Sequence, residues 1–422
     1  MFENFVGNSM FEFEFLNTEL WLKYTQERYV PLEDIKYRLD KLGESKKDWP
    51  QLKEKIQTYR KMGSIPFFFK SIDKKFWFYP SDSILKKIQY IETAGVNLFE
   101  TISTQSVFKN EFISNASVEE AVTSAIYEGA NSTRSKAKAL IASCEGPKNK
   151  DEWMLINNYN AMKWIKDNAV LPVSTGLILK IHEIVSNNTL SGDDANFCGK
   201  FRNDTVYVGK HEGIPHNKIN EALGEAIELT TNHPRFLHGL IKGILLHYFT
   251  AFIHPFFDGN GRTARTLFYF KSIKNDLKFV ELLSVSADLK SHGKRYVKSF
   301  DLVKEHDLDV TYFIDFCLDS LVTAVGKVER KLEFLMKITA LEDKDNLTRN
   351  QVSLLQRLSL NKHKVISIEE YSSDIGKSRE IARRELKDLL GKELLDEIKQ
   401  GKKFVYRINT SNLRAKLWGA SS

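Results

Sequence analysis

Hydrophobic residues recur mostly at three- and four-residue steps along the chain, which predicts a mainly α-helical protein. Residues 32–62 and 83–107 show this period among many lysines and glutamates. Between them lie two short aromatic runs, residues 65–69 and 76–79, which predict a hairpin or two buried connecting strands. We therefore expect an N-terminal helical accessory domain over residues 1–100.

The middle of the chain combines helices with one β signal. The pattern Ser117-Val-Glu-Glu120 is typical of a capping box, so it predicts a helix that begins there and ends at Gly129. Residues 199–209 resemble two strand segments on either side of a turn at Asn203-Asp204.

A strongly apolar helix is expected from about Arg235 to Ile253. A glycine-rich turn then interrupts the pattern, and a further helix is expected from Arg262 to about Lys274.

The C-terminal segment carries the charge imbalance of the chain. The 422 residues have a formal net charge of +7, and residues 346–422 hold sixteen Lys and Arg against nine Asp and Glu, so the remainder is neutral. This distribution predicts a separate basic module. A winged helix-turn-helix is expected over 346–422. One helix opens with a capping box at 347–351, two more follow at 367–373 and 378–390, and segments 394–398 and 404–408 form the wing hairpin.

The charges of the helix expected over 378–390 indicate whether the module binds DNA or protein. This helix carries the basic residues Arg379, Arg383, Arg384 and Lys387, and the acidic residues Glu380, Glu385 and Asp388. That balance is modest for a helix entering a DNA groove, so a protein-contact or dimerisation role ranks first and DNA binding is the alternative.

Composition excludes several classes of protein. With 42% hydrophobic and 28% charged residues, the chain is of ordinary globular type. No run of eighteen apolar residues and no secretory signal are visible, so no membrane contact is expected. Cys144, Cys198 and Cys317 lie far apart, which predicts reduced core thiols in a cytoplasmic protein without a disulfide framework or a zinc site.

The turn between the two central helices carries the candidate chemistry. It reads His254-Pro-Phe-Phe-Asp-Gly-Asn-Gly-Arg-Thr-Ala-Arg265. Glycines flank the start of a helix, where free amides and the helix dipole favour an anion, and two arginines follow on one expected face. A carboxylate beside that anion suits magnesium, and a histidine can accept a hydroxyl proton near neutral pH. These features together indicate a triphosphate site.

This segment resembles the signature of the Fic (filamentation induced by cAMP) family, His-Pro-Phe-x-Asp-Gly-Asn-Gly-Arg-x-x-Arg, at every specified position. The resemblance extends over residues 101–337 and implies a helical catalytic core with its signature loop at 254–265. It implies transfer of AMP from ATP to a Ser, Thr or Tyr hydroxyl of a protein, with ATP as substrate and Mg²⁺ as cofactor. Self-modification and formation of a homodimer are also possible for such a protein.

The resemblance also implies roles for single residues. His254 would be the general base, and Asp258 would hold magnesium between the α- and β-phosphates. Asn260 would contact the α-phosphate, and Arg262 and Arg265 the β/γ end. The full ATP-binding set would comprise Phe256, Gly259, Asn260, Gly261, Arg262 and Arg265.

Ser124, Glu128 and Gly129 match the inhibitory motif of the same family, Ser/Thr-x-x-x-Glu-Gly/Asn, on the helix expected over 117–129. Glu128 would pair with Arg265 where the γ-phosphate belongs. In some relatives this glutamate positions a water that removes AMP, so a hydrolytic role stays open.

A flap hairpin over residues 199–215 would dock the target by strand addition, through Thr205, Val206, Tyr207 and Val208. Two further readings of the function stay open. The first is a DNA-binding regulator with a vestigial core. The second is a de-AMPylase or a phosphotransferase like the Doc toxins, which depart from the Gly-Asn-Gly-Arg stretch that is complete here.

Overall fold

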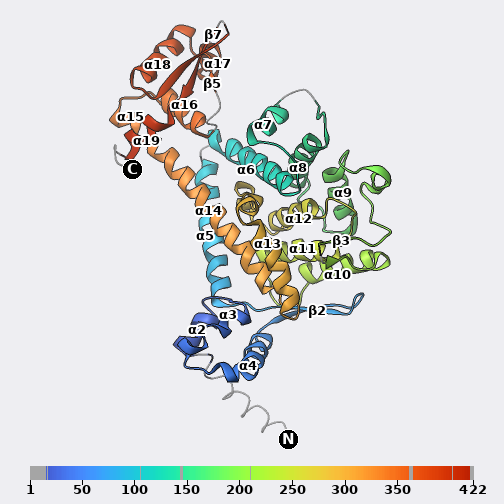
Figure 1. The fold of residues 1–422 in the computed structure, drawn as a ribbon. Coiled ribbons are helices and arrows are strands. Elements are labelled where there is room, and N and C mark those ends of the chain that lie inside the picture. The colour runs from blue at the N-terminus through green and yellow to red at the C-terminus, as the bar shows by residue number, and fades with distance from the viewer. Residues whose placement is uncertain are drawn as a thin grey trace. The chain divides into compact units, whose positions relative to one another are not determined.

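The computed structural model describes residues 16, 18–104, 106–142, 146–209, 211–360, 365–401 and 403–418. This part of the chain is mainly helical, with three small antiparallel sheets (Figure 1), which confirms the predicted fold class. The chain forms two compact units. One comprises residues 1–99 and 116–325, and the other comprises residues 100–115 and 326–422.

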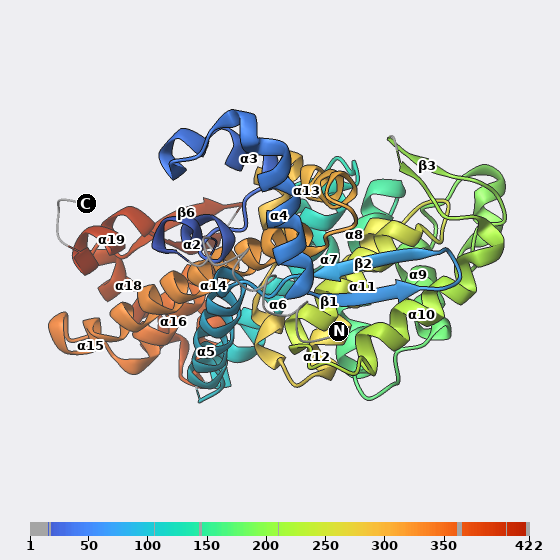
Figure 2. The ribbon, with the colours of Figure 1, turned by 90° about the horizontal axis from the view of Figure 1, so that it is seen from below.

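The first unit begins with short helices and a hairpin: α2 (Glu19–Thr25), α3 (Leu32–Lys36), α4 (Trp49–Met62), β1 (Ile65–Phe69) and β2 (Lys74–Phe78). The two aromatic runs therefore form the expected hairpin. The hairpin lies along helix α11 (Gly239–Ile253; Figure 2). The rings of Phe69 and Phe249, one from each element, are 4.8 Å apart. Residues 1–99 share one compact unit with the central helices. A separate accessory domain over residues 1–100 stays a prediction.

The remaining helices up to the end of α14 are α5 (Asp82–Thr104), α6 (Ser106–Tyr127), α7 (Arg134–Ala142), α8 (Lys150–Asp167), α9 (Thr175–Ser186), α10 (Ile219–Thr231), α12 (Asn260–Lys274), α13 (Ser286–Glu305) and α14 (Thr311–Thr339). Helix α11 is buried on almost every side, as its continuous apolar sequence predicts. Its expected start at Arg235 is wrong, because His238 caps the helix by accepting a hydrogen bond from the N–H of Leu240.

The capping box expected at Ser117 is also wrong. Helix α6 already begins at Ser106, so Ser117 and Glu120 lie in its interior. The Ser117 hydroxyl accepts a hydrogen bond from Lys166 (2.9 Å), and the Glu120 carboxylate accepts from the hydroxyl of Tyr269 (2.8 Å) and the N–H of Ser286 (2.9 Å). A four-residue polar pattern does not distinguish a helix start from buried polar groups that bind neighbouring helices.

The second unit ends with α15 (Leu341–Lys344), α16 (Arg349–Leu360), β5 (Val365–Ile366), α17 (Ile368–Ile375), α18 (Arg379–Gly391), β6 (Leu395–Gln400), β7 (Lys403–Ile408) and α19 (Thr410–Trp418). The strands form one sheet in the order β5-β7-β6. Ser367 and Glu370 form a capping box at the start of α17. The predicted helices and hairpin are therefore present, while α19 was not expected; the winged-helix assignment itself stays a prediction.

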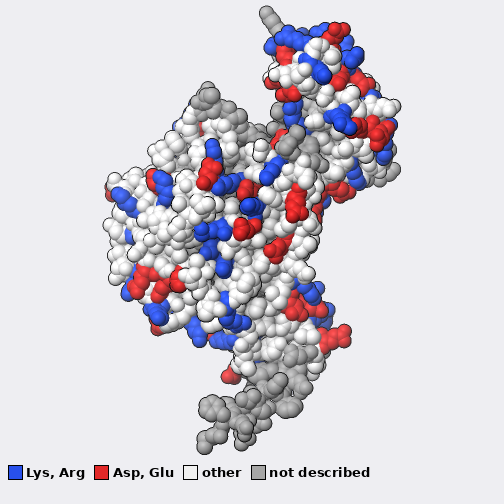
Figure 3. All heavy atoms as spheres, turned by 180° about the vertical axis from the view of Figure 1, so that it is seen from behind, with Lys and Arg blue, Asp and Glu red and all other residues white. Residues whose placement is uncertain are grey.

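On the face that Figure 3 shows, basic and acidic side chains are interspersed and form no large patch of one sign. Among the described helices, none is long and apolar enough to cross a bilayer. Cys198 and Cys317 are free thiols, but only Cys317 is fully buried; Cys144 lies outside the described residues.

Candidate active site

The loop between α11 and α12 is held closed by its own side chains. His254 ends α11 in the left-handed conformation (φ 53°), and Gly259 (φ 81°) precedes α12. The Asn260 side chain accepts from the N–H of Phe256 (3.0 Å) and donates to the carbonyl of the same residue (2.8 Å). The loop therefore presents the free amides of the α12 N-terminus in a fixed direction, which suits an anion.

A carboxylate already occupies this anion position. Arg265 donates from Nη2 to Glu128 Oε1 (2.7 Å) and from Nε to Ser124 Oγ (3.0 Å), both on or at the end of α6. A Cβ atom on Gly261 would lie 2.3 Å from Glu128 Oε1 and 3.0 Å from Arg265 Nη1. That Nη1 is buried and has no hydrogen-bond partner among the described residues. Arg265 and the N-terminus of α12 thus form a binding position for negative charge, which we call the phosphate cradle. One donor there, Arg265 Nη1, has no partner among the described residues.

The close approach at Gly261 yields a prediction. In Gly261→Ala, the new methyl group must displace the Glu128 carboxylate and weaken its ion pair, at a cost of about 1–3 kcal/mol. We expect a lower midpoint of thermal unfolding for Gly261→Ala than for the parent. In a Glu128→Gly background the same substitution should cost much less. Equal losses in both backgrounds would show that the two residues do not interact.

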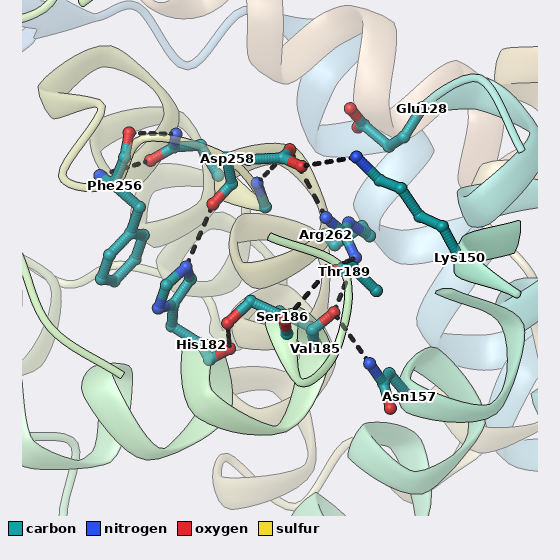
Figure 4. A network of polar contacts seen from close by, with 12 residues as sticks. Glu128, Lys150, Asn157, His182, Val185, Ser186, Thr189, Phe256, Asp258 and Arg262 are labelled. Atoms are coloured by element: carbon teal, nitrogen blue, oxygen red, sulfur yellow. Dashed lines mark hydrogen bonds and ion pairs between the residues drawn. The ribbon is translucent and has the colours of Figure 1, made fainter. Parts of the chain in front are cut away.

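The Asp258 carboxylate is the accessible hard oxygen of the site. Its Oδ1 atom accepts from the N–H of Gly259 (2.5 Å) and lies 3.4 Å from Arg262 Nη2, while its Oδ2 atom lies 3.9 Å from Lys150 Nζ (Figure 4). In the part of the chain that the structure describes, no three His, Cys, Asp or Glu side chains gather around a metal position. A magnesium ion at Asp258 would therefore take its other ligands from phosphate oxygens and water.

The His254 imidazole is suited to accept a proton. Burial lowers its pKa to about 4, so the ring is neutral near pH 7. Its Nδ1 atom lies 3.4 Å from the Ala251 carbonyl, which can only accept a hydrogen bond. The ring proton is therefore assigned to Nδ1, which leaves the Nε2 lone pair free to act as a base.

The same segment is matched by a known family. A model of the Fic/DOC family matches residues 172–270, which include α9 to the middle of α12 with the loop between α11 and α12. The chain contains a Fic domain.

Curated proteins that resemble part of this chain are named protein adenylyltransferases. The protein adenylyltransferase Fic of Drosophila virilis is 38% identical over 112 residues, which are 25% of this chain and 22% of that protein. Protein adenylyltransferase fic-1 of Caenorhabditis briggsae is 33% identical over 96 residues, 22% of this chain and 18% of its own length. The chain thus spans about a fifth of the length of these curated relatives.

A solved structure supports the fold. The crystal structure of a Fic family protein from Desulfovibrio desulfuricans G20 has a TM-score of 0.52 and 18% sequence identity, covering 78% of this chain and 96% of that chain. This likeness concerns the arrangement of the backbone alone.

The structure brings several of the predicted residues together. His254, Asp258 and Gly259 lie in one loop and Gly261 in the first turn of α12, and Ser124 and Glu128 contact Arg265. That Arg262 and Arg265 share one face toward the phosphates stays a prediction. Arg262 is buried, donates to the Val185 carbonyl of α9 (2.6 Å) and lies 3.4 Å from Asp258 Oδ1 (Figure 4). Phe256 is fully buried, and Gly129 ends the helix with φ 95°.

The hairpin expected to be the flap is small. Its strands are β3 (Tyr207–Val208) and β4 (His211–Glu212), which pair antiparallel. The hairpin turn follows β3 at Gly209, so the turn expected at Asn203-Asp204 is wrong. Thr205 and Val206 precede β3, and the Val206 carbonyl accepts from the N–H of Gly213 (3.0 Å). Tyr207 is 69% exposed and available to a partner strand.

Sequence reasoning missed His182, a buried residue of α9 that supports the loop. Its Nδ1 accepts from the N–H of Gly199 (3.1 Å), so Nε2 carries the proton and donates to the Asp258 carbonyl (3.0 Å). The ring stacks on Phe256 with centroids 3.6 Å apart. An isolated histidine on an apolar helix carries no spacing signal that could have revealed this role.

Proposed function

We propose that this protein transfers AMP from ATP to a hydroxyl group of a protein, and that Glu128 restrains the reaction. The observation that carries the proposal is the carboxylate of Glu128 against Gly261 and Arg265. A site that holds one anion at a helix N-terminus, with a spare buried arginine donor, can hold a phosphate group in its place. The curated relatives, which are named protein adenylyltransferases, support the choice of reaction.

The residues act on three parts of the reaction. The target oxygen attacks the α-phosphorus of ATP as the bond to the bridging oxygen breaks, and pyrophosphate leaves. His254 Nε2 takes the hydroxyl proton, since the ring is neutral. Arg265 and the amides of Gly261 and its neighbours hold the phosphates and stabilise charge. Asp258 would hold Mg²⁺, which neutralises phosphate charge when bound.

Glu128 would restrain transfer by occupying the position of the terminal phosphate. While Arg265 is paired with Glu128 (2.7 Å), it has one fewer donor for ATP, and two negative groups compete for one cradle. A hydrolytic role, in which Glu128 positions a water to remove AMP, is the alternative. It predicts that an AMP-modified target protein loses its AMP more slowly when incubated with the Glu128→Gly variant than with the parent protein.

The type of reaction is tested by labelling. The Glu128→Gly variant is incubated with Mg²⁺ and ATP labelled either in the α- or in the γ-phosphate, together with a cell extract that supplies targets. We expect covalent label only from α-labelled ATP. Label only from γ-labelled ATP would indicate a phosphotransferase, and no label with intact nucleotide binding would favour a vestigial core. A cytoplasmic location and a homodimer stay predictions.

We further propose DNA binding as a second activity, located in the C-terminal unit. On α18 burial removes one of three acidic side chains from the exposed surface, while Glu380 and Asp388 stay exposed. Glu385 is buried and accepts from the Tyr371 hydroxyl (2.5 Å), and Asp388 accepts from Gln351 on α16 (2.8 Å). Arg383, Arg384 and Lys387 are exposed. The exposed face is therefore more basic than the sequence of the helix suggests, which suits phosphate contacts.

The DNA proposal is tested by fluorescence anisotropy with a labelled duplex at several salt concentrations. We expect Arg383→Glu/Arg384→Glu to weaken binding roughly tenfold or more and to reduce the slope of log K against log salt by about 2, because two phosphate contacts are lost. Arg414→Glu, on exposed α19, is the control for charge. A parent that binds no duplex at low salt, or an equal effect of the control, would contradict the proposal.

A further inference from the structure

A single buried arginine joins the flap to the signature loop. Arg202 is 2% exposed, and its guanidinium donates to three main-chain carbonyls: from Nε to His254 (2.8 Å), from Nη1 to Asp204 (2.6 Å) and from Nη2 to Ile214. Its own N–H donates to the Pro255 carbonyl (3.0 Å). One residue therefore fixes two successive carbonyls of the loop and both ends of the flap.

The flap depends on these bonds because it has little structure of its own. Strands β3 and β4 contribute two residues each, and Asp204 and Ile214 flank them. Gly213 allows the close approach, since a Cβ there would lie 2.7 Å from Arg202 Nη2. A second contact comes from His211, whose Nε2 lies 2.8 Å from the Phe252 carbonyl of α11.

The loop depends on the same bonds. His254 has a left-handed backbone (φ 53°), which residues other than glycine rarely adopt without support. The hydrogen bonds from residue 202 end on the carbonyls of residues 254 and 255, so they hold the peptide groups that direct the imidazole. A shift of this arginine therefore moves the flap and the candidate base together.

We propose that Arg202 is a positioning residue that couples the seating of a target segment on the flap to the placement of the His254 imidazole. The inference rests on the proposed function, because it assigns this residue a part in that reaction. A segment that pairs with β3 orders the hairpin, and the ordered hairpin holds the guanidinium against the His254 carbonyl. Transfer to a docked target is then favoured over hydrolysis in an empty site.

Two substitutions separate the geometry of Arg202 from its charge. Arg202→Lys keeps the positive charge but cannot donate to all three carbonyls with the geometry of a guanidinium. Arg202→Gln loses both the charge and that geometry. In a Glu128→Gly background we expect both to lower kcat for a protein target roughly tenfold or more, since small misplacement of a base is costly. The KM for ATP should stay within about threefold, because the phosphate cradle does not include Arg202.

The acid side of the pH profile provides a readout that a merely structural role would not move. Burial lowers the His254 pKa most; among the titratable and charged side chains near the ring, His211 and Arg202 lower the pKa further and Glu128 raises it. Removing the Arg202 cation favours the imidazolium, so the His254 pKa should rise in Arg202→Gln. The acid limb of kcat/KM then moves to higher pH. In Arg202→Lys it should stay near that of the parent.

NMR titration of the His254 ring, assigned by comparison with His254→Ala, tests the coupling without any transfer of AMP. Amide hydrogen exchange over the flap should become faster in both Arg202 variants. The control is Arg235→Gln, which removes an exposed arginine that also donates to a carbonyl, that of Ser64 (2.8 Å). Thermal unfolding shows that each variant is folded.

Unchanged kcat, unchanged flap exchange and an unshifted His254 titration in Arg202→Gln would overturn the inference. So would equal losses in the kcat for the protein target and in ATP binding, which would indicate general damage. If no variant transfers AMP while the His254 pKa and the flap exchange change as expected, the proposed function fails and the coupling by Arg202 stands.

Discussion

Glu128→Gly is expected to increase AMP transfer by roughly 10- to 100-fold over the parent protein. In the parent, the Arg265 guanidinium is 3% exposed and donates to Glu128 Oε1 at 2.7 Å. A hydrogen bond to a charged group contributes about 1.5–3 kcal/mol, which corresponds to that range of rates if it is lost and regained by the phosphate. The measurement is the initial rate of label transfer from α-labelled ATP at saturating Mg²⁺.

Two controls make this result specific. Glu305→Gly removes the exposed glutamate that ends α13, so it repeats the same change at another helix end. It should leave the rate unchanged. Glu128→Gln keeps the shape of the side chain but removes its charge, and we expect an intermediate gain. Equal rates in Glu128→Gly and the parent would remove the restraint from the account.

His254→Ala is expected to lower the rate of transfer about 10²- to 10⁴-fold in the Glu128→Gly background, because the target hydroxyl loses its proton acceptor. The affinity for ATP, measured by calorimetry with Mg²⁺, should change little, since the imidazole lies outside the phosphate cradle. Burial lowers the His254 pKa to about 4, so activity should persist down to mildly acidic pH and fall only as the ring becomes protonated.

His216→Ala, which removes an exposed histidine beside α10, is the matched control and should retain full activity. A His254→Ala protein that transfers AMP at the parent rate would show that another group takes the proton. A protein that loses transfer and ATP binding together would show that His254 shapes the loop rather than serving as the base.

The sequence predicted the parts of the site that depend on local residues. The glycines and Asn260 sit at a helix start in sequence, and the structure has the start of α12 there. Ser124 and Glu128 are spaced by one helical turn, so their common approach to Arg265 follows from helix geometry once the helix is assigned. The tail helices were predicted from local signals, including the Ser367 cap.

The contacts that were not predicted depend on tertiary packing. Arg262 donates to the Val185 carbonyl of α9, a contact that the spacing of the two arginines does not predict. Ser117 and Glu120 bind groups on other helices, and no local pattern reports such partners. Arg202 and His182 stabilise the loop through main-chain carbonyls distant in sequence. The sequence gives the type of each residue, but the roles of Arg202 and His182 depend on where main-chain carbonyls lie in the folded protein.

Intact-mass spectrometry after incubation with ATP and Mg²⁺ tests the central claim most directly. The samples are the parent, Glu128→Gly, His254→Ala and the double variant, each at equal concentration. The account predicts a mass gain of one AMP in Glu128→Gly, little gain in the parent, and none in the double variant. A gain of one phosphate, or an AMP gain that persists without His254, would contradict it.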